Sequence, residues 1–487
     1  MGILYFGDNL DILREHIKDE SIDLIYLDPP FNSKRGYNVF MMTPKGHESD
    51  AQIMAFDDTW HWGEEAEREF SEILHKPNTD VSEVIQSLRR FLNESDIMAY
   101  LTMMTNRLLE LHRVLKVTGS LYLHCDPTAS HYLKVVMDAI FGKQNFRNEI
   151  VWCYKRWPSK QDNFQQMHDI ILRYSKTKDV TWNQLYDDFT EQTKKRIKGG
   201  MKIEHIIGKS GKILIRPTEE KSPGVAMCDY WNIPMIAGQA KERLGYPTQK
   251  PLALLERIIR ASSNKDDVVL DPFCGCGTAV HAAQNLEREW IGIDITSLAI
   301  GLIEKRMKKA FPGISFEIQG TPKDLEGARN LADRDKYQFQ WWACYLVDAQ
   351  PYQGHKKGAD SGIDGLIFFQ DDFSKGAKKI IVSVKSGENV TRTMIADLKN
   401  TVEREKAEIG LFVTLANPTH PMITEAASAG FYESPRGQYP KIQILTIEDL
   451  LSGKTRPQYT DISSGSFNFK KAETEEKRVE QDRFKDF

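Results

Sequence analysis

Residues 268–278 read Val-Val-Leu-Asp-Pro-Phe-Cys-Gly-Cys-Gly-Thr, an apolar run that leads into a glycine-rich turn. Residues 277–286 continue with apolar side chains at helical spacing, which predicts a buried strand, a tight turn and a helix. Glycines at such a turn let the backbone bend sharply and approach a ligand closely. A second apolar run, 290–293, follows the helix and ends in Asp294. A strand, a helix and a strand in this order predict an α/β fold with a parallel sheet.

The end of the second predicted strand indicates a nucleoside site. A carboxylate at the position of Asp294 can accept hydrogen bonds from both hydroxyls of a ribose. The turn lacks the G-x-G-x-x-G pattern that cradles the pyrophosphate of a dinucleotide, and an acid and a phenylalanine precede its glycines. These features suit S-adenosylmethionine, whose nucleoside carries no phosphate.

A second motif lies near the N-terminus. Residues 1–27 predict a strand, a helix and a buried strand, and the last of these ends abruptly at Asp28-Pro29-Pro30-Phe31. The prolines fix φ and remove N–H donors, so carbonyl oxygens are left free. The amino group of a nucleobase is a poor nucleophile because its lone pair is delocalised into the ring. The Asp28 carboxylate and the Pro29 carbonyl would grip its hydrogens as a methyl group approaches, and Phe31 would stack on a base flipped out of the duplex.

Three motifs together resemble the beta class of amino-methylating DNA methyltransferases, which modify adenine N6 or cytosine N4. They are the Asp28-Pro29-Pro30-Phe31 motif, residues 246–251 (Tyr-Pro-Thr-Gln-Lys-Pro) and residues 271–278 (Asp-Pro-Phe-Cys-Gly-Cys-Gly-Thr). The resemblance covers about residues 1–310. It implies a seven-stranded Rossmann-like sheet in permuted order, with the catalytic motif before the cofactor motif. Aspartate rather than serine at position 28 favours adenine in this family.

The resemblance also implies roles for residues around the cofactor. Asp8 would meet its adenine, Thr248 and Lys250 would lie by its methionine end, and Phe273 and Asp294 would flank adenine and ribose. The expected catalytic residues are Asp28, Pro29, Pro30 and Phe31, and the expected cofactor-binding residues are Asp8, Thr248, Lys250, Asp271, Phe273, Gly275, Gly277 and Asp294.

Residues 155–245 break the strand–helix rhythm and are expected to form the target-recognition insert. Residues 194–221 carry nine lysines and arginines against three glutamates, although the whole chain has a net charge of −4. A lysine run is often a solvated surface loop, but in an acidic chain this excess also fits phosphate contacts. The residues expected to bind DNA are Lys194, Lys195, Arg196 and Lys198. Residues 32–95 are expected to form a long, irregular lid or binding loop.

A second α/β unit is expected at 337–452, after a charged linker, and a charged tail at 453–487. Asp364 and Lys385 lie in a pattern that resembles Mrr-type restriction endonucleases, in which carboxylates hold Mg²⁺ and a lysine orients water. They form the putative nuclease site, with Asp364 as its metal ligand. Ser383 departs from the family pattern, because it stands where that family has Glu or Gln and a hydroxyl is a poor Mg²⁺ ligand. A degenerate DNA-binding domain is the alternative.

The chain has 487 residues, which predicts a methyltransferase domain at 1–320 and at least one more domain. Six scattered cysteines exclude a disulfide framework, and no signal peptide or long apolar run is apparent, so a cytoplasmic protein is expected. The sequence predicts methyl transfer from S-adenosylmethionine to adenine N6 in double-stranded DNA. It leaves the oligomeric state open, with a homodimer as the candidate. The alternatives are N4-cytosine methylation, a fused nuclease that uses the methyltransferase half to recognise its site, an RNA substrate and a binding-only protein.

Overall fold

The computed structural model describes residues 2–30, 36–42, 48–57, 61–156, 162–189, 201–207, 213–221, 224–244, 246, 248–352, 362–371 and 378–461. The predicted residues Phe31, Lys194, Lys195, Arg196 and Lys198 lie outside them.

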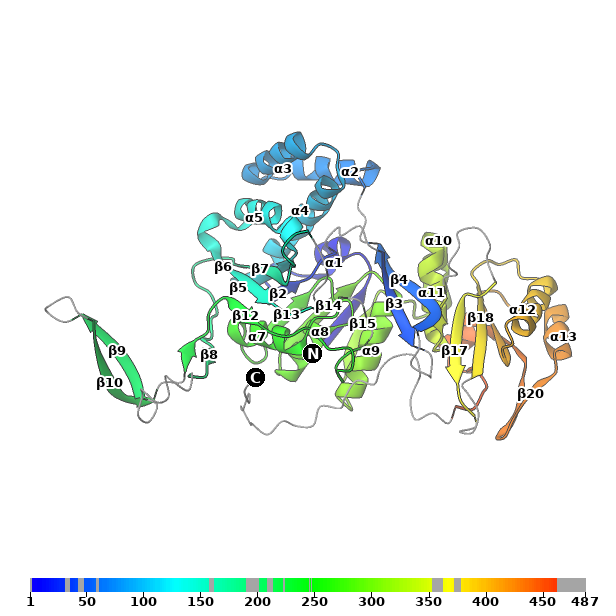
Figure 1. Cartoon of the computed structure of the whole chain (residues 1–487). Helices are drawn as coiled ribbons and strands as arrows, with labels where there is room; N and C mark the ends of the chain where they lie inside the picture. The colour runs from blue at the N-terminus through cyan, green and yellow to red at the C-terminus, as the bar shows by residue number, and fades with distance from the viewer. Residues whose placement is uncertain are drawn as a thin grey trace.

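The described residues form one large sheet, flanked by helices, and a smaller second sheet (Figure 1). The large sheet has nine strands, more than the seven expected, and all its pairings are parallel except those of β7 with its neighbours β5 and β6. Its strands, in spatial order, are β12 (Tyr230–Asn232), β6 (Phe146–Cys153), β7 (His168–Ser175), β5 (Leu115–Cys125), β2 (Ile22–Leu27), β13 (Val268–Asp271), β14 (Glu289–Asp294), β1 (Gly2–Phe6) and β15 (Phe316–Gln319). The predicted α/β class is therefore confirmed.

Helices cover both faces of this sheet because its central strands are apolar on both sides. In β2, Leu24 and Tyr26 belong to the core under one group of helices, whereas Ile25 and Leu27 belong to the core under the other. The first group is α7 (Leu252–Ser262), α8 (Thr278–Asn285) and α9 (Ser297–Ala310); the second is α1 (Asn9–His16), α4 (Asp96–Val114) and α5 (Pro127–Phe141).

The described part of 32–95 forms strands and helices, so the expectation of an irregular loop was wrong there. This part contains the antiparallel hairpin β3 (Gly36–Met42) and β4 (Glu48–Asp57), followed by α2 (Glu64–Leu74) and α3 (Thr79–Leu92). Both helices have a clear apolar face, with Phe70 and Ile73 of α2 buried.

One part of residues 155–245 belongs to the large sheet, and another part lies apart from it. Strand β7 lies within this stretch and pairs with two strands of the large sheet. The hairpin of β9 (Met201–Ile207) and β10 (Ile213–Lys221) stands away from both sheets in Figure 1. The short strands β8 (Tyr186–Asp187) and β11 (Val225–Ala226) pair with each other.

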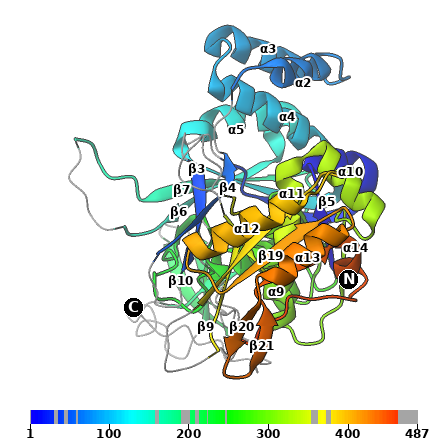
Figure 2. The same ribbon diagram turned by 90° about the vertical axis from the view of Figure 1, so that its right-hand side faces the viewer.

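The second sheet has five strands, with β18 parallel to β19 and β19 parallel to β22. In order they are β16 (Gln350–Pro351), β17 (Gly365–Phe369), β18 (Lys378–Lys385), β19 (Ile409–Thr414) and β22 (Ile442–Thr446). Figure 2 shows the helices α12 (Arg392–Arg404) and α13 (His420–Ser428) on the outer face of this sheet. The hairpin β20 (Phe431–Ser434) and β21 (Gly437–Pro440) and the helix α14 (Ile447–Leu451) complete this part of the chain.

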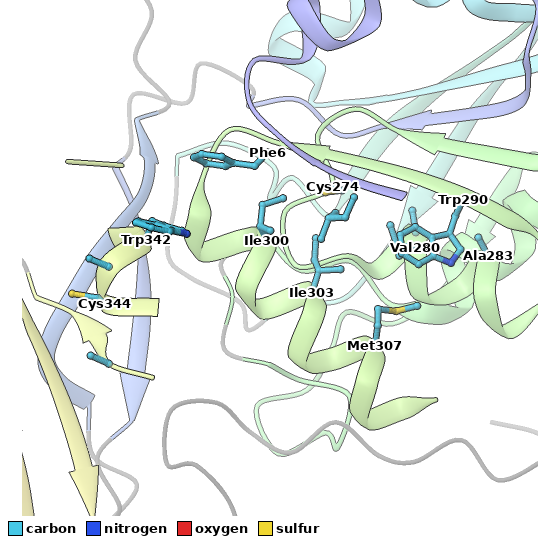
Figure 3. Close-up of a cluster of buried hydrophobic side chains, with 14 of the residues drawn as sticks. Phe6, Cys274, Val280, Ala283, Trp290, Ile300, Ile303, Met307, Trp342 and Cys344 are labelled. Carbon is cyan, nitrogen blue, oxygen red and sulfur yellow. The ribbon is translucent and has the colours of Figure 1, made fainter. Parts of the chain in front are cut away.

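Two helices connect the sheets, α10 (Leu325–Arg334) and α11 (Lys336–Leu346). One continuous cluster of buried side chains runs from the large sheet through α11 to the second sheet. Figure 3 shows Trp342 of α11 near Phe6 and Ile300, and Cys344 of the same helix on the side of the second sheet. Among the described residues, no helix combines the length and the apolar composition needed to cross a membrane.

Candidate active site

A pocket of about 380 Å³ lies at the carboxyl ends of β1, β2, β13 and β14. Ligands of open parallel sheets bind at this edge because the loops after the strands converge there. The pocket brings together the predicted residues Asp8, Asp28, Pro29, Pro30, Thr248, Lys250, Asp271, Phe273, Gly275 and Asp294. Residues from the two ends of the predicted methyltransferase region therefore share one site.

The glycine turn after β13 is tied to the end of β14. The Gly275 N–H donates to Asp294 Oδ2 at 2.9 Å, and Gly275 has a φ of 49°. The other Asp294 oxygen accepts from the Thr296 backbone N–H at 2.9 Å and the Thr296 hydroxyl at 2.8 Å. The carboxylate predicted to bind a ribose thus also holds together the two loops that form the pocket.

Gly277 does not line the pocket. It precedes α8 with a φ of 73°, and a Cβ there would lie 2.8 Å from Cγ1 of the buried Ile303. The position requires glycine for the left-handed turn and for helix packing. The expectation of a direct cofactor contact at Gly277 thus gains no support from the geometry.

Asp28 has one occupied and one unoccupied oxygen. The Lys250 ammonium donates to its Oδ2. Its Oδ1 is buried and has no hydrogen-bond partner among the described residues, since the His124 Nδ1 lies 4.0 Å away. A buried acceptor without a donor costs about 1–3 kcal/mol. Such a cost is typical of a functional site that a ligand completes.

A chain of buried polar groups lies behind Asp28, and the sequence analysis did not find it. The Tyr26 hydroxyl and His124 Nδ1 are 3.0 Å apart, His124 Nε2 lies 3.2 Å from Asp169 Oδ2, and the Tyr154 hydroxyl donates to Asp169 Oδ1 at 2.9 Å. Because β2 and β5 are parallel with Leu27 opposite Leu123, the residues that end them lie side by side. The signal available in the sequence was His124 itself, a polar residue near the end of the buried, apolar half of β5.

Burial and neighbouring charges determine the protonation of Asp169 and Tyr26 in this row of buried polar groups. Burial opposes charge on Asp169, but the hydrogen bond and charge of His124 and the charge of Lys250 outweigh it, so the pKa of Asp169 is lowered. Burial and the nearby Asp28 raise the pKa of the Tyr26 hydroxyl. Tyr26 therefore stays neutral beside an ionised Asp169.

Replacing His124 by alanine is expected to lower the free energy of unfolding by about 2–4 kcal/mol, because it removes partners of two buried groups, Tyr26 and Asp169. Urea unfolding followed by far-UV circular dichroism measures the change. The exposed His131 of α5 gives the matched control, and His131→Ala should have no effect. An unchanged unfolding transition in His124→Ala would show that the chain of polar groups adds no stability.

Asp8 is held in a structural arrangement within the pocket wall. Its Oδ1 accepts from the Leu10 N–H at 2.7 Å and so caps α1, and its Oδ2 accepts from Arg107 Nη2 at 2.9 Å. Arg107 also donates from Nε to Asn9 at 2.7 Å and lines the pocket itself. The sequence analysis missed Arg107, which lies in the middle of the long helix α4.

The pocket is lined by more carboxyl groups than basic groups. The carboxylates among its described lining residues are Asp8, Asp28, Asp271 and Asp294, and the cations are Arg107 and Lys250. Burial raises the pKa of Asp271 well above its usual value, and the charges of Asp28 and Asp294 add to this effect. Burial likewise raises the pKa of Asp294. A cationic ligand would relieve this repulsion, and the acceptors after β14 suit hydroxyl groups, so the site fits a sulfonium nucleoside.

The loop before α7 reaches the pocket in a strained conformation. Thr248 has a φ of 60°, which is rare for a β-branched residue and costs about 1–3 kcal/mol. The neighbouring Gln249 holds this loop, because its amide accepts from the Leu244 N–H at 2.8 Å and donates to the Glu242 carbonyl at 2.7 Å.

In the second sheet, Asp364 and Lys385 come together as predicted, with Lys385 Nζ 4.0 Å from Asp364 Oδ2. Both Asp364 oxygens accept hydrogen bonds, from Gln340 Nε2 at 2.8 Å and from the Val384 N–H at 2.7 Å. Ser383 is buried. No group of three or more His, Cys, Asp or Glu side chains within the described ranges is arranged to hold a metal ion.

The chain matches two family models. Residues 22–305 match the N6/N4 methyltransferase model, described as DNA methylase, and residues 345–452 match the model described as NACHT-associated inactive Restriction Endonuclease 1. The second match confirms the predicted restriction-endonuclease-like unit.

Curated relatives share the first region. The Type II methyltransferase M.EcaI of Enterobacter cloacae is 27% identical over 358 residues, which cover 63% of this chain and 69% of that protein. The DNA adenine methyltransferase YhdJ of Escherichia coli is 31% identical over 230 residues, which cover 47% of this chain and 72% of that protein. A solved structure of a putative DNA modification methylase from Thermus thermophilus covers 65% of this chain and 98% of that chain, with 17% identity and a TM-score of 0.36.

The methylase match spans more than half of the chain and contains both the Asp28 motif and the glycine turn. The chain therefore belongs to the family of S-adenosylmethionine-dependent DNA methyltransferases that modify the amino group of adenine N6 or cytosine N4.

Proposed function

We propose that this chain transfers a methyl group from S-adenosylmethionine to adenine N6 at specific sites in double-stranded DNA. The observation that carries the proposal is the buried Asp28 Oδ1, which has no hydrogen-bond partner among the described residues and lies in the same pocket as the glycine turn. The relatives named Type II methyltransferases support a place in restriction–modification or in marking of DNA.

The Asp28 motif can hold an amino group by its two hydrogens. Asp28 Oδ1 accepts one N–H, and the Pro29 carbonyl, to which no described residue donates, accepts the other. Both acceptors favour the pyramidal nitrogen that develops as a bond to carbon forms, so they stabilise the transition state more than the ground state. Lys250 holds the other Asp28 oxygen and so fixes the orientation of the carboxylate.

When bound, S-adenosylmethionine supplies an electrophilic methyl group. The residues that would hold it are Asp271 and Asp294, whose negative charge complements its positive charge, and Phe273 and Gly275, which line the pocket beside them. Asp294 Oδ2 accepts only from Gly275 among the described residues, so it keeps a lone-pair site for a ribose hydroxyl, whereas the two bonds from Thr296 occupy Oδ1.

Methyl transfer to DNA is the direct test of this function. We expect label from tritiated S-adenosylmethionine to enter duplex DNA from a host without DNA methylation, and not RNA of the same sequence. Label in RNA alone, or none in either from protein that binds the cofactor, would contradict the proposal. N4-cytosine methylation is the second candidate, since the same two acceptors can hold a cytosine amino group.

Cofactor binding is expected to strengthen as the pH rises. Burial raises the pKa of Asp271 and Asp294 in the free protein, and a cationic ligand favours their ionised forms, so binding releases protons. The affinity should therefore increase as the pH rises through these raised pKa values. Calorimetry in two buffers of different ionisation enthalpy measures the proton release. An affinity that does not change with pH, with no proton release on binding, would contradict this coupling.

We propose that the second sheet carries a domain that does not cleave DNA. In the predicted pair of Asp364 and Lys385, only Asp364 is a carboxylate, and its oxygens already accept hydrogen bonds from Gln340 and Val384. The buried Ser383 is a weak Mg²⁺ ligand. Supercoiled plasmid incubated with the protein and Mg²⁺ is expected to stay intact, and Asp364→Ala should behave identically. Nicking that Asp364→Ala abolishes would establish a nuclease instead.

The DNA-binding residues of the 155–245 stretch remain predictions. Lys194, Lys195, Arg196 and Lys198 lie outside the described residues, and their positive charge supports contacts to phosphate. A homodimer also remains a prediction, which sedimentation of the purified chain can check.

A further inference from the structure

Helix α11 contributes two residues, Gln338 and Trp341, to the wall of the cofactor pocket. The helix lies beyond residue 305, where the methylase match ends, and most of it precedes residue 345, where the second match begins. Neither match therefore covers these two residues, and the family resemblance assigned them no role.

The packing of α11 fixes where these residues stand. Trp342 is 2% exposed and packs in the cluster with Phe6 and Ile300 (Figure 3). On the next turn, the ring of Tyr345 lies so close to α9 that a Cβ on Gly301 would be 2.4 Å from its Cε2. Since α9 begins directly after the loop that carries Asp294, a helix held on α9 is also held beside that loop.

Gln338 contacts this loop directly. Its Oε1 accepts from the Ser297 N–H at 3.4 Å, at the start of α9. Ile295 and Thr296 also line the pocket, and Ile295 is 53% exposed despite its apolar side chain. The half-buried Trp341 completes this wall on the side of α11. The wall combines an indole, an aliphatic side chain and an amide next to the carboxylate that suits a ribose.

We propose that Trp341 and Gln338 bind the nucleoside of the cofactor, so that the helix joining the two sheets completes the methyl-donor site. This inference rests on the cofactor assigned under the proposed function. An indole face stacks on a purine, and such stacking is worth about 1–3 kcal/mol per base. The Gln338 amide offers donors and an acceptor for the polar edge of a purine or for a ribose hydroxyl.

The test measures binding of S-adenosylhomocysteine and of 5′-methylthioadenosine to the full-length chain by calorimetry. The second ligand keeps the nucleoside and lacks the amino acid. Trp341→Ala is expected to weaken both ligands by the same factor, about 10- to 100-fold, whereas Trp341→Phe retains most of the affinity. Tyr337→Ala is the matched control, because Tyr337 lies on the same helix, is 69% exposed and does not line the pocket.

The outcomes separate this inference from the proposed function. Wild-type protein that binds neither ligand would contradict the cofactor assignment itself. Wild-type protein that binds both, with unchanged affinity in Trp341→Ala and Gln338→Ala, would overturn the role of α11. If Trp341→Ala melts at a lower temperature than Tyr337→Ala, the affinities of Gln338→Ala and Trp341→Phe replace it as the test. A loss of nucleoside affinity in Gln338→Ala, with affinity retained in Trp341→Phe, supports the inference. An unchanged affinity in Gln338→Ala contradicts it.

Discussion

Replacing Asp28 by alanine is expected to reduce the rate of methyl transfer about 100- to 1,000-fold, the loss typical of removing one preorganised transition-state contact. The reason is the geometry of the carboxylate, whose buried Oδ1 has no partner in the described part of the chain and whose Oδ2 is fixed by Lys250. Without it, the Pro29 carbonyl alone would remain of the proposed pair of acceptors. Single-turnover transfer of labelled methyl groups to duplex DNA measures the effect.

The control for Asp28→Ala is its cofactor affinity. Among the described residues, no hydrogen bond or ion pair joins Asp28 to Gly275 or Asp294, so S-adenosylhomocysteine should still bind, with an affinity within about tenfold of wild type. Methyl transfer that survives in Asp28→Ala within about tenfold of the wild-type rate would refute the catalytic assignment. Loss of cofactor binding together with transfer would show instead that Asp28 and Lys250 form part of the donor site.

Replacing Gly275 by valine is expected to weaken cofactor binding by about 100-fold or more, and so to abolish methyl transfer at ordinary cofactor concentrations. Gly275 has a φ of 49°, a conformation that a β-branched residue resists. Its Cβ would lie 3.2 Å from Cε1 of Tyr246, so the added side chain would also enter the pocket wall. Calorimetry with S-adenosylhomocysteine measures the loss.

Gly313 provides a matched control for the backbone part of this effect. It has a φ of 84°, and nothing lies within 4 Å of its Cβ position. Gly313→Val should therefore share the conformational strain and leave cofactor binding unchanged. Equal cofactor affinity in Gly275→Val and wild type would show that the glycine turn does not approach the ligand.

The sequence was enough to place those site residues that belong to a motif and also stand at the end of a predicted strand. Asp28, Asp271 and Asp294 all end apolar strands, and parallel strands place their carboxyl ends at one edge. These three residues therefore meet in one pocket because β2, β13 and β14 are neighbours in the sheet, although β2 lies far from the other two strands in the sequence.

The missed residues are those whose role depends on tertiary packing. Arg107 lies within α4 and His124 within the end of β5, where the local pattern predicts only a helix and a buried strand. Trp341 lies on a helix far from both motifs, and only its packing on α9 brings it to the pocket. The long stretch 32–95 was misjudged because its helices are amphipathic but highly charged, so their apolar faces were hidden among polar residues.

The central claim is that this pocket methylates the amino group of adenine in DNA. The most direct measurement is nucleoside digestion and mass spectrometry of unmethylated plasmid that has been incubated with the protein and S-adenosylmethionine. We predict N6-methyladenine, formed by the wild type and formed about 100- to 1,000-fold more slowly with Asp28→Ala. N4-methylcytosine would contradict the base assignment while leaving the family intact. The claim itself would be contradicted if no methylated base formed, although the protein binds the cofactor and the plasmid contains its DNA site.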